Sequence, residues 1–172
     1  MINKGYATAK TDKESDEVFT PEYAVKPLIK YLEQFKKDPI IWCPFDLKNS
    51  AFVKIFKDNG FKVISSHIDN GENFFYFEPK QHYDIIISNP PFSQKDDVLK
   101  RLTELNKPFA MLLPVATLQG QKRFPYLQNI QYLGFDKRIN FYKKGINTKG
   151  IPFATCYICK NFLPKDLIIE KL

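Results

Sequence analysis

The stretch Asp84-Ile85-Ile86-Ile87-Ser88-Asn89-Pro90-Pro91-Phe92 decides the fold, because an apolar run there leads directly into an Asn-Pro-Pro-aromatic sequence. Three consecutive isoleucines are β-branched and place apolar side chains on both faces, which is typical of a buried strand in a parallel sheet. We therefore predict a strand from Tyr83 to Ser88. A parallel sheet needs helices over both of its faces, so the sequence predicts an α/β fold.

The residues that follow this strand have the chemistry of a binding site. Pro90 and Pro91 fix φ and donate no hydrogen bond, so a stiff chain should present the Asn89 side chain and two carbonyl oxygens to open space. Acceptors without nearby donors suit an amino group as ligand. In open α/β sheets the ligand crevice lies beyond the carboxyl ends of the strands, where these residues fall. The alternative is a proline-stiffened loop without a function.

Asn89-Pro90-Pro91-Phe92 after an apolar strand resembles the catalytic motif of amino-group methyltransferases, in particular small phage-type enzymes that methylate adenine N6 in DNA. The resemblance implies S-adenosyl-L-methionine as cofactor. It also implies that the Asn89 side-chain oxygen and the Pro90 carbonyl accept the two amino hydrogens, while Phe92 stacks on an extruded base. The implied fold is a Rossmann-like class I methyltransferase, with a mostly parallel twisted sheet, an antiparallel C-terminal strand and helices on both faces.

Phe19-Thr20-Pro21 begins the structured part of the chain, because Thr20 can cap a helix whose first position is Pro21. The preceding residues 16–19 resemble the lead-in of the small phage enzymes. In that family a Thr-Pro here contributes backbone contacts to the methionine end of the cofactor, so Phe19, Thr20 and Pro21 are candidate cofactor-binding residues. The alternative is a simple helix start.

Ile40 to Cys43 is predicted to form the first strand, and the turn after it is where the family has a glycine-rich cofactor loop. Glycine lets the backbone approach a bound molecule closely. In this chain Pro44 and Phe45 keep the frame of that loop, but no glycine follows. Asp46 is expected to hold the amino group of the methionine moiety. The alternative is that the loop is closed and the cofactor site is lost.

A second strand, Phe61 to Ser66, ends where the family usually has an acidic residue for the ribose hydroxyls. His67 and Asp69 are the candidates here, since either side chain can hydrogen-bond a hydroxyl. The alternative for His67 is a turn histidine without a ligand. Asn73 and Phe74 resemble the family's Asp-Phe segment beside the adenine ring, with Asn in place of Asp.

Positive charge is concentrated in the second half of the chain. Residues 1–88 carry a net charge of −1 and residues 89–172 a net charge of +8, which together give the +7 of the whole chain. Aromatic residues are interleaved with the cations between positions 120 and 160, as a partner with phosphates and stackable bases would require. The candidate nucleic-acid-binding residues are Lys122, Arg123, Lys137, Arg138, Lys143 and Lys144. The alternative is a lysine-rich solvated surface.

Residues 137–141, Lys-Arg-Ile-Asn-Phe, resemble a stretch of the small phage enzymes, and we expect Arg138 to meet phosphate. We expect the nucleic acid to be DNA rather than RNA. Cys156 and Cys159 have the C-x-x-C spacing, but on a predicted strand positions three apart point to opposite faces, and the sequence has no second cysteine pair. No metal is therefore expected. No apolar run is long enough to span a membrane and no secretory signal begins the chain, which predicts a cytoplasmic protein.

The 172 residues are expected to form a flexible N-terminal segment, 1–18, and one domain, 19–172, without a separate target-recognition domain. Recognition of a target sequence would then be weak or supplied by a partner protein. Three alternatives to a DNA-adenine methyltransferase stay open. They are a catalytically degenerate nucleic-acid-binding relative, a methyltransferase for RNA adenine or protein glutamine, and an α/β interaction module without a ligand.

Overall fold

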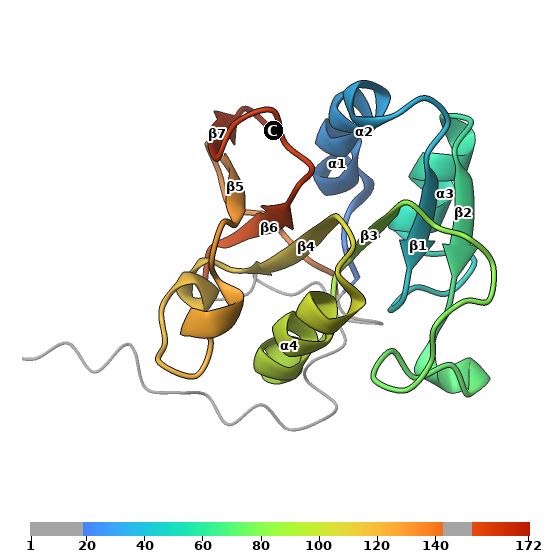
Figure 1. Ribbon diagram of the computed structural model, residues 1–172. Helices are drawn as coiled ribbons and strands as arrows, with labels where there is room; N and C mark the ends of the chain where they lie inside the picture. Colours follow the sequence, from blue (N-terminus) through green and yellow to red (C-terminus); the bar gives the residue numbers. More distant parts are fainter. Residues whose placement is uncertain (1–18, 143–152) are drawn as a thin grey trace, which may run out of the picture.

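The computed structural model describes residues 19–142 and 153–172, which build one seven-stranded sheet and its helices (Figure 1). The strands are β1 (Ile40–Cys43), β2 (Lys62–Ser65), β3 (Ile85–Ser88), β4 (Phe109–Pro114), β5 (Gln131–Phe135), β6 (Thr155–Lys160) and β7 (Leu167–Glu170). The α-helices are α1 (Glu22–Val25), α2 (Ile29–Phe35), α3 (Ala51–Asp58) and α4 (Lys95–Leu105). Short 3-10 helices are η2 (Lys26–Leu28), η3 (Ile68–Asn70), η4 (Phe92–Gln94), η5 (Val115–Leu118) and η6 (Phe124–Tyr126).

The sheet confirms the predicted Rossmann-like α/β class. Its strand order is β2-β1-β3-β4-β6-β5-β7, and of the strands that the structure describes only β6 runs antiparallel to its neighbours. The antiparallel strand is not the last one, however, because β7 follows it and pairs in parallel with β5 at the edge of the sheet. The predicted strand at Tyr83 begins two residues later, at Ile85.

The helices cover both faces of the sheet, as predicted. The connection β1–α3–β2 and the connection β3–α4–β4 leave the neighbouring strands β1 and β3 in opposite directions along the sheet. Since such crossovers are right-handed, α3 and α4 lie on opposite faces. Helix α1 contacts α3 and shares its face, and Figure 1 shows α4 on the other side.

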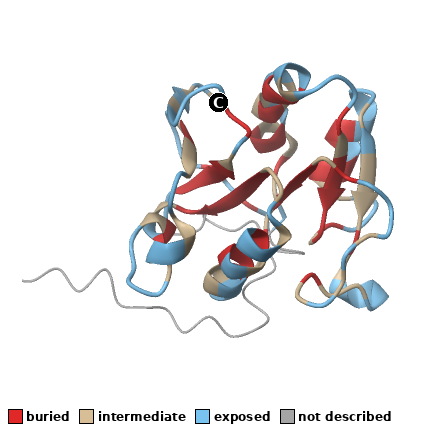
Figure 2. Ribbon diagram, viewed as in Figure 1, coloured by how far each residue is buried: buried red, intermediate tan, exposed pale blue. Residues whose placement is uncertain are grey.

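The core lies along the four central strands, which are buried on both faces (Figure 2). Ile85, Ile86 and Ile87 are fully buried, which explains why this strand carries no alternation of polar and apolar residues. Trp42 on β1 is the largest fully buried side chain, and its indole N–H donates to the Ser66 hydroxyl at 2.9 Å. Strand β1 is therefore hydrogen-bonded through Trp42 to the first residue after β2.

The first helix differs from the prediction at its start. Pro21 is the N-cap of α1 and Glu22 its first residue, and the Thr20 hydroxyl makes no capping bond. Proline at the cap leaves no side-chain acceptor for the first N–H groups of the helix. The helix also changes to the 3-10 form at Lys26–Leu28, where Pro27 interrupts the α-helical hydrogen bonds.

No helix among the residues that the structure describes is both long and apolar enough to cross a lipid bilayer.

Candidate active site at the carboxyl end of the sheet

Strands β1 and β3 are neighbours whose chains leave in opposite directions, so a crevice is expected beyond their carboxyl ends, Cys43 and Ser88. We call the side where the parallel strands end the carboxyl end of the sheet, and the opposite side the amino end. The loop after β1, the turn after β2 and the Asn-Pro-Pro-Phe sequence after β3 all lie at the carboxyl end. The sequence elements expected to act together are thus placed on one side of the sheet.

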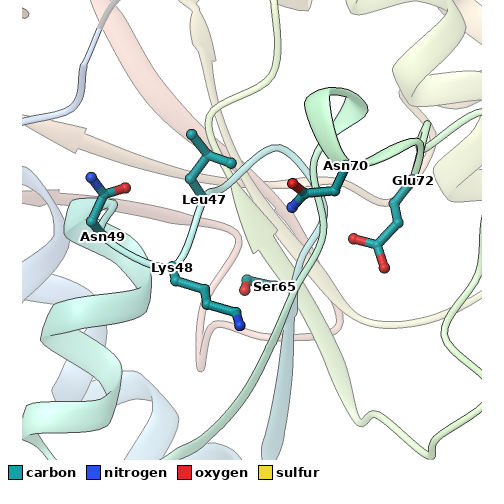
Figure 3. Close-up of a pocket in the computed structure, with 6 residues that line it drawn as sticks. All are labelled: Leu47, Lys48, Asn49, Ser65, Asn70 and Glu72. Atoms are coloured by element: carbon teal, nitrogen blue, oxygen red, sulfur yellow. The ribbon is translucent and has the colours of Figure 1, made fainter.

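A cavity of about 650 Å³ opens beyond β1 and β2. It is lined by Leu47, Lys48, Asn49, Ser65, Asn70 and Glu72. Figure 3 shows the Lys48 side chain, from the loop after β1, and the Glu72 side chain, from the loop after η3, extending into the same space. The volume is typical of a site for a cofactor-sized molecule, and the lining offers a cation, a carboxylate and two amides.

Asp46 does not line this cavity, although the three residues that follow it do. Its side chain is buried and accepts a hydrogen bond from the Ser88 hydroxyl, while its backbone N–H donates to the Ser66 carbonyl at 3.1 Å. Burial raises the pKa of Asp46 to about 6, although hydrogen bonds from Ser88 and Ser50 oppose the rise. The expected contact with a cofactor amino group is therefore replaced by an internal bond to the end of β3.

Asn89-Pro90-Pro91-Phe92 follows β3 directly, but these residues are less exposed to solvent than the sequence analysis predicted. Pro90 is buried, Asn89 is half-buried, and the Asn89 Oδ1 atom is shielded from solvent. Phe92 is only 9% exposed, with its ring edge-to-face against Phe141 at 6.0 Å and Phe153 at 5.6 Å. In this structure Phe92 belongs to an aromatic cluster rather than to an exposed stacking surface.

His67 and Asp69 contact each other at the end of β2. The His67 Nδ1 atom accepts from the Asp69 N–H at 3.2 Å and lies 3.3 Å from the Asp69 carboxylate, so His67 caps the short helix η3. Neither residue lines the cavity, whereas Glu72 does. Glu72 is the acidic residue that sequence reasoning missed, because it lies beyond a helical turn that no sequence pattern predicted.

Asn73 and Phe74 also have structural contacts. The Asn73 side-chain oxygen accepts from the Phe75 N–H at 3.0 Å and closes a local turn. Phe74 is 2% exposed and packs against Trp42 and Phe45. The Phe45 and Phe74 rings therefore pack against each other beneath the loop after β1. Pro44, the residue before Phe45, is also buried.

The start of the described chain lies beside the basic segment. Phe19 and Tyr142 form an antiparallel bridge with N–H to O distances of 2.7 and 3.0 Å, and the Tyr23 hydroxyl accepts from the Asn140 N–H. The same segment reaches the Asn-Pro-Pro-Phe sequence through Phe141. Lys137 and Arg138 are exposed within it. Thr20, which follows Phe19, is half-buried, and Pro21 is buried.

The other candidate cations have different positions. Lys122 is exposed, but Lys143 and Lys144 lie outside the described residues, as do residues 1–18. Arg123 is not available to a phosphate, because its guanidinium is bonded to the Asp96 carboxylate and to the carbonyls of Ala116 and Gln119. It joins the loop before η6 to helix α4, a structural role that the charge pattern did not predict.

Cys43, Cys156 and Cys159 are free and buried, and the described residues contain no cluster of three or more side chains suited to a metal ion.

Comparison with known proteins does not identify a family for this chain. No protein-family model matches the chain, and no curated protein matches it. Among solved structures, one from Thermoplasma acidophilum, provisionally described as a methyltransferase, is similar over 88% of this chain and 68% of that one, with 12% identity and a TM-score of 0.35. A likeness at this level carries no weight for function, which has to be argued from the residues of the site.

Proposed function

We propose that this protein is an S-adenosyl-L-methionine-dependent methyltransferase that acts on an exocyclic amino group, adenine N6 in DNA. One observation carries the proposal. The Asn89-Pro90-Pro91-Phe92 sequence follows the fully buried strand β3 at the carboxyl end of a Rossmann-like sheet. At the same end, a cavity of about 650 Å³ lies beyond β1, which is the neighbour of β3, and β2, which is the next strand in the sheet. A site for an amino group and a site for a cofactor would thus share one side of the sheet.

The chemistry of Asn89 fits an amino substrate. The lone pair of the adenine amino group is delocalised into the ring, which makes the nitrogen a weak nucleophile. Two acceptors, the Asn89 side-chain oxygen and the Pro90 carbonyl, would draw the nitrogen toward tetrahedral geometry and return the lone pair to it. Prolines on both following positions hold these oxygens without competing N–H donors. On this proposal the aromatic contacts of Phe92 open when a base enters.

The cavity residues fit the functional groups of the cofactor. The Glu72 carboxylate can accept hydrogen bonds from ribose hydroxyls, and the Asn70 amide can accept from them or donate to them. Lys48 offers a positive charge for the methionine carboxylate. When bound, S-adenosyl-L-methionine supplies an electrophilic methyl group. We further propose that Phe19, Thr20 and Pro21 contact its methionine end, and that His67 and Asp69 border the ribose.

The nucleic-acid part of the proposal rests on the exposed cations Lys122, Lys137 and Arg138. The last two belong to the segment that contacts Phe92 through Phe141, so a phosphate bound there would lie beside the amino-group site. Lys143 and Lys144 are proposed to extend this basic surface. The preference for DNA over RNA rests on the resemblance of the chain to small phage-type enzymes that methylate adenine N6 in DNA.

A labelling experiment tests the function and the substrate class together. Purified protein is incubated with S-adenosyl-L-methionine carrying a labelled methyl group and, separately, with DNA, RNA and cell protein. We expect label in DNA, at adenine N6. Asn89→Ala should lower the transfer rate at least about 100-fold, while affinity for S-adenosylhomocysteine stays within a few fold. Unchanged transfer by that variant would contradict the proposed role of Asn89, and label in protein or RNA would correct the substrate.

A second candidate function is a nucleic-acid-binding protein that no longer holds the cofactor. Two observations favour it: the loop after β1 has no glycine, and the Asp46 side chain is turned toward the interior. Calorimetry with S-adenosylhomocysteine separates the two candidates. Micromolar binding that is weakened by Glu72→Gln would support the enzyme, and absence of binding together with tight DNA binding would support the second candidate.

A further inference from the structure

A buried hydrogen bond joins the cofactor loop to the proposed catalytic sequence. The Ser88 hydroxyl donates to Asp46 Oδ2, across 42 positions of sequence. Both residues are buried, with Asp46 7% exposed and Ser88 fully buried. Because a buried carboxylate is costly unless it is hydrogen-bonded, this contact is expected to be well ordered.

Each partner stands directly before residues of a proposed site. Asp46 precedes Leu47, Lys48 and Asn49, which line the cavity. Ser88 precedes Asn89. The position of a side chain depends on the backbone that carries it. The Asp46–Ser88 bond therefore fixes the position of the Asn89 backbone relative to the cavity residues that follow Asp46.

The backbone around Asp46 connects this bond to the rest of the sheet. The Asp46 N–H donates to the Ser66 carbonyl, and the Ser66 N–H donates to the Cys43 carbonyl, both at 3.1 Å. The ends of β1 and β2 are thus held together by main-chain bonds, and the Ser88 hydroxyl adds a side-chain bond from the last residue of β3 to Asp46. That contact is the part of the junction that a change in charge can weaken.

The groups that face the Asp46 carboxylate are mostly neutral. Ser88 and Ser50 hydrogen-bond to it, and His67 is the nearby group that can carry a positive charge. Burial raises the pKa of Cys43 on β1 and of Tyr157 on β6, and the nearby Asp46 carboxylate adds to both rises. Burial outweighs the hydrogen bonds and raises the pKa of Asp46 to about 6, so this carboxyl changes its charge close to neutral pH.

We infer that Asp46 is a positioning residue, which in its ionised form holds Ser88 and thereby keeps Asn89 in register with the cavity wall. Protonation removes the negative acceptor, weakens the bond from Ser88 and lets the Asn89 backbone shift away from that register. The inference rests on the proposed function for the identity of the ligands, but the link between Asp46 and Asn89 is a property of this chain and can be measured without any ligand.

Nuclear magnetic resonance of the full chain tests the link. The Asp46 carboxyl carbon and the Asn89 side-chain amide are followed from pH 4.5 to 8. We expect both to shift with one midpoint near pH 6, and the Asn89 transition to vanish in Asp46→Asn and Ser88→Ala. Ser88→Thr, which keeps the hydroxyl, should retain the Asn89 transition. An Asn89 signal that ignores the Asp46 titration, or that keeps its transition in Asp46→Asn, overturns the inference.

Two further variants exclude other causes. Histidine titrates in the same pH range, so His67→Gln should retain the Asn89 transition if Asp46 is its source. Asp84→Asn, a matched change at the opposite end of β3, should also leave the transition in place. If the transition disappears in His67→Gln but persists in Asp46→Asn, His67 is the titrating group and the inference is wrong.

Kinetics separate a positioning role from a merely structural one. Ser88→Ala should lower kcat roughly 10- to 100-fold while S-adenosylhomocysteine affinity changes by less than about threefold. In the unmodified protein kcat should rise with pH through about 6, and in Asp46→Asn it should be flat there. Absence of any methyl transfer or cofactor binding would count against the proposed function alone, because the resonance titration still decides the link.

Discussion

A carboxylate ties β1 to β3 at each end of these two strands, and the two carboxylates are held in opposite ways. At the amino end Asp84 accepts from the Ile40 N–H at 2.9 Å, from His82 at 2.9 Å and from the Lys36 ammonium at 2.5 Å. Burial opposes its ionisation, but these bonds outweigh burial and hold the pKa of Asp84 well below its usual range. At the carboxyl end Asp46 is bonded by serine hydroxyls, and burial dominates.

This difference separates an end of the sheet built for stability from an end that keeps a costly charge. A carboxylate with a cation and a backbone donor stabilises the folded state, whereas a buried carboxylate with a raised pKa destabilises it at neutral pH. Such costly charges are found where ligands bind and reactions occur. The carboxyl end is also where the cavity and Asn89 lie, so the energetics and the proposed chemistry indicate the same end.

The largest expected effect comes from breaking the amino-end contact. Asp84→Ala removes the acceptor of the Ile40 N–H and leaves Lys36 without its partner, so we expect a loss of about 3 kcal/mol in the free energy of unfolding at pH 7. Urea denaturation measures it. Because the folded pKa is depressed, this stabilisation is present above the unfolded pKa and is lost as pH falls below about 4. A loss as large at pH 3 as at pH 7 would contradict the ionic explanation.

The opposite sign is expected at the carboxyl end. Asp46 has a raised folded pKa, so its charge costs no stability below about pH 4, and the cost grows as pH rises to about 6. Asp46→Asn removes the charge and should therefore raise the free energy of unfolding at pH 8 by about 2 kcal/mol, with little change at pH 4. Denaturation at both pH values tests this. If Asp46→Asn is destabilising at pH 8, the two ends do not differ as described.

The strand pattern and the motif could be predicted from sequence because they depend on local chemistry. Three isoleucines need burial on both faces, and this fixed β3 and the class of sheet. Three contacts could not be predicted, because the two residues of each pair lie more than 20 positions apart and are brought together by the packing of the sheet. They are Asp46 with Ser88, Arg123 with Asp96, and Phe92 with Phe141. Charge alone marked Arg123 as a phosphate ligand, while the fold gives it Asp96. Glu72 was missed because its approach to the cavity depends on the turn at η3.

The cations offer a comparison of the two ends with a smaller expected effect. Lys137→Gln with Arg138→Gln should weaken DNA binding by about 1 to 2 kcal/mol and lower the slope of log affinity against log salt by about 2. The matched pair Lys57→Gln and Lys62→Gln removes the same charge from exposed positions, with Lys62 at the amino end. Fluorescence anisotropy across a salt series measures both. Equal effects of the two pairs would show general attraction rather than a binding surface at the carboxyl end.

The smallest effect concerns Ser50, which connects the Asp46 carboxylate to helix α3. Its hydroxyl oxygen accepts from the Val53 N–H at 3.3 Å as the N-cap, and the same hydroxyl hydrogen-bonds to Asp46. Ser50→Ala should cost about 1 kcal/mol through loss of the cap. It also removes one of the bonds that oppose the effect of burial, so the pKa of Asp46 should rise further. Ser50→Gly retains most of the cap energy but not the hydroxyl, and should give the pKa rise with a smaller loss of stability. A carboxyl titration that is unchanged in both variants would mean that Ser88 alone holds Asp46, and the junction would then depend on the strand that carries Asn89.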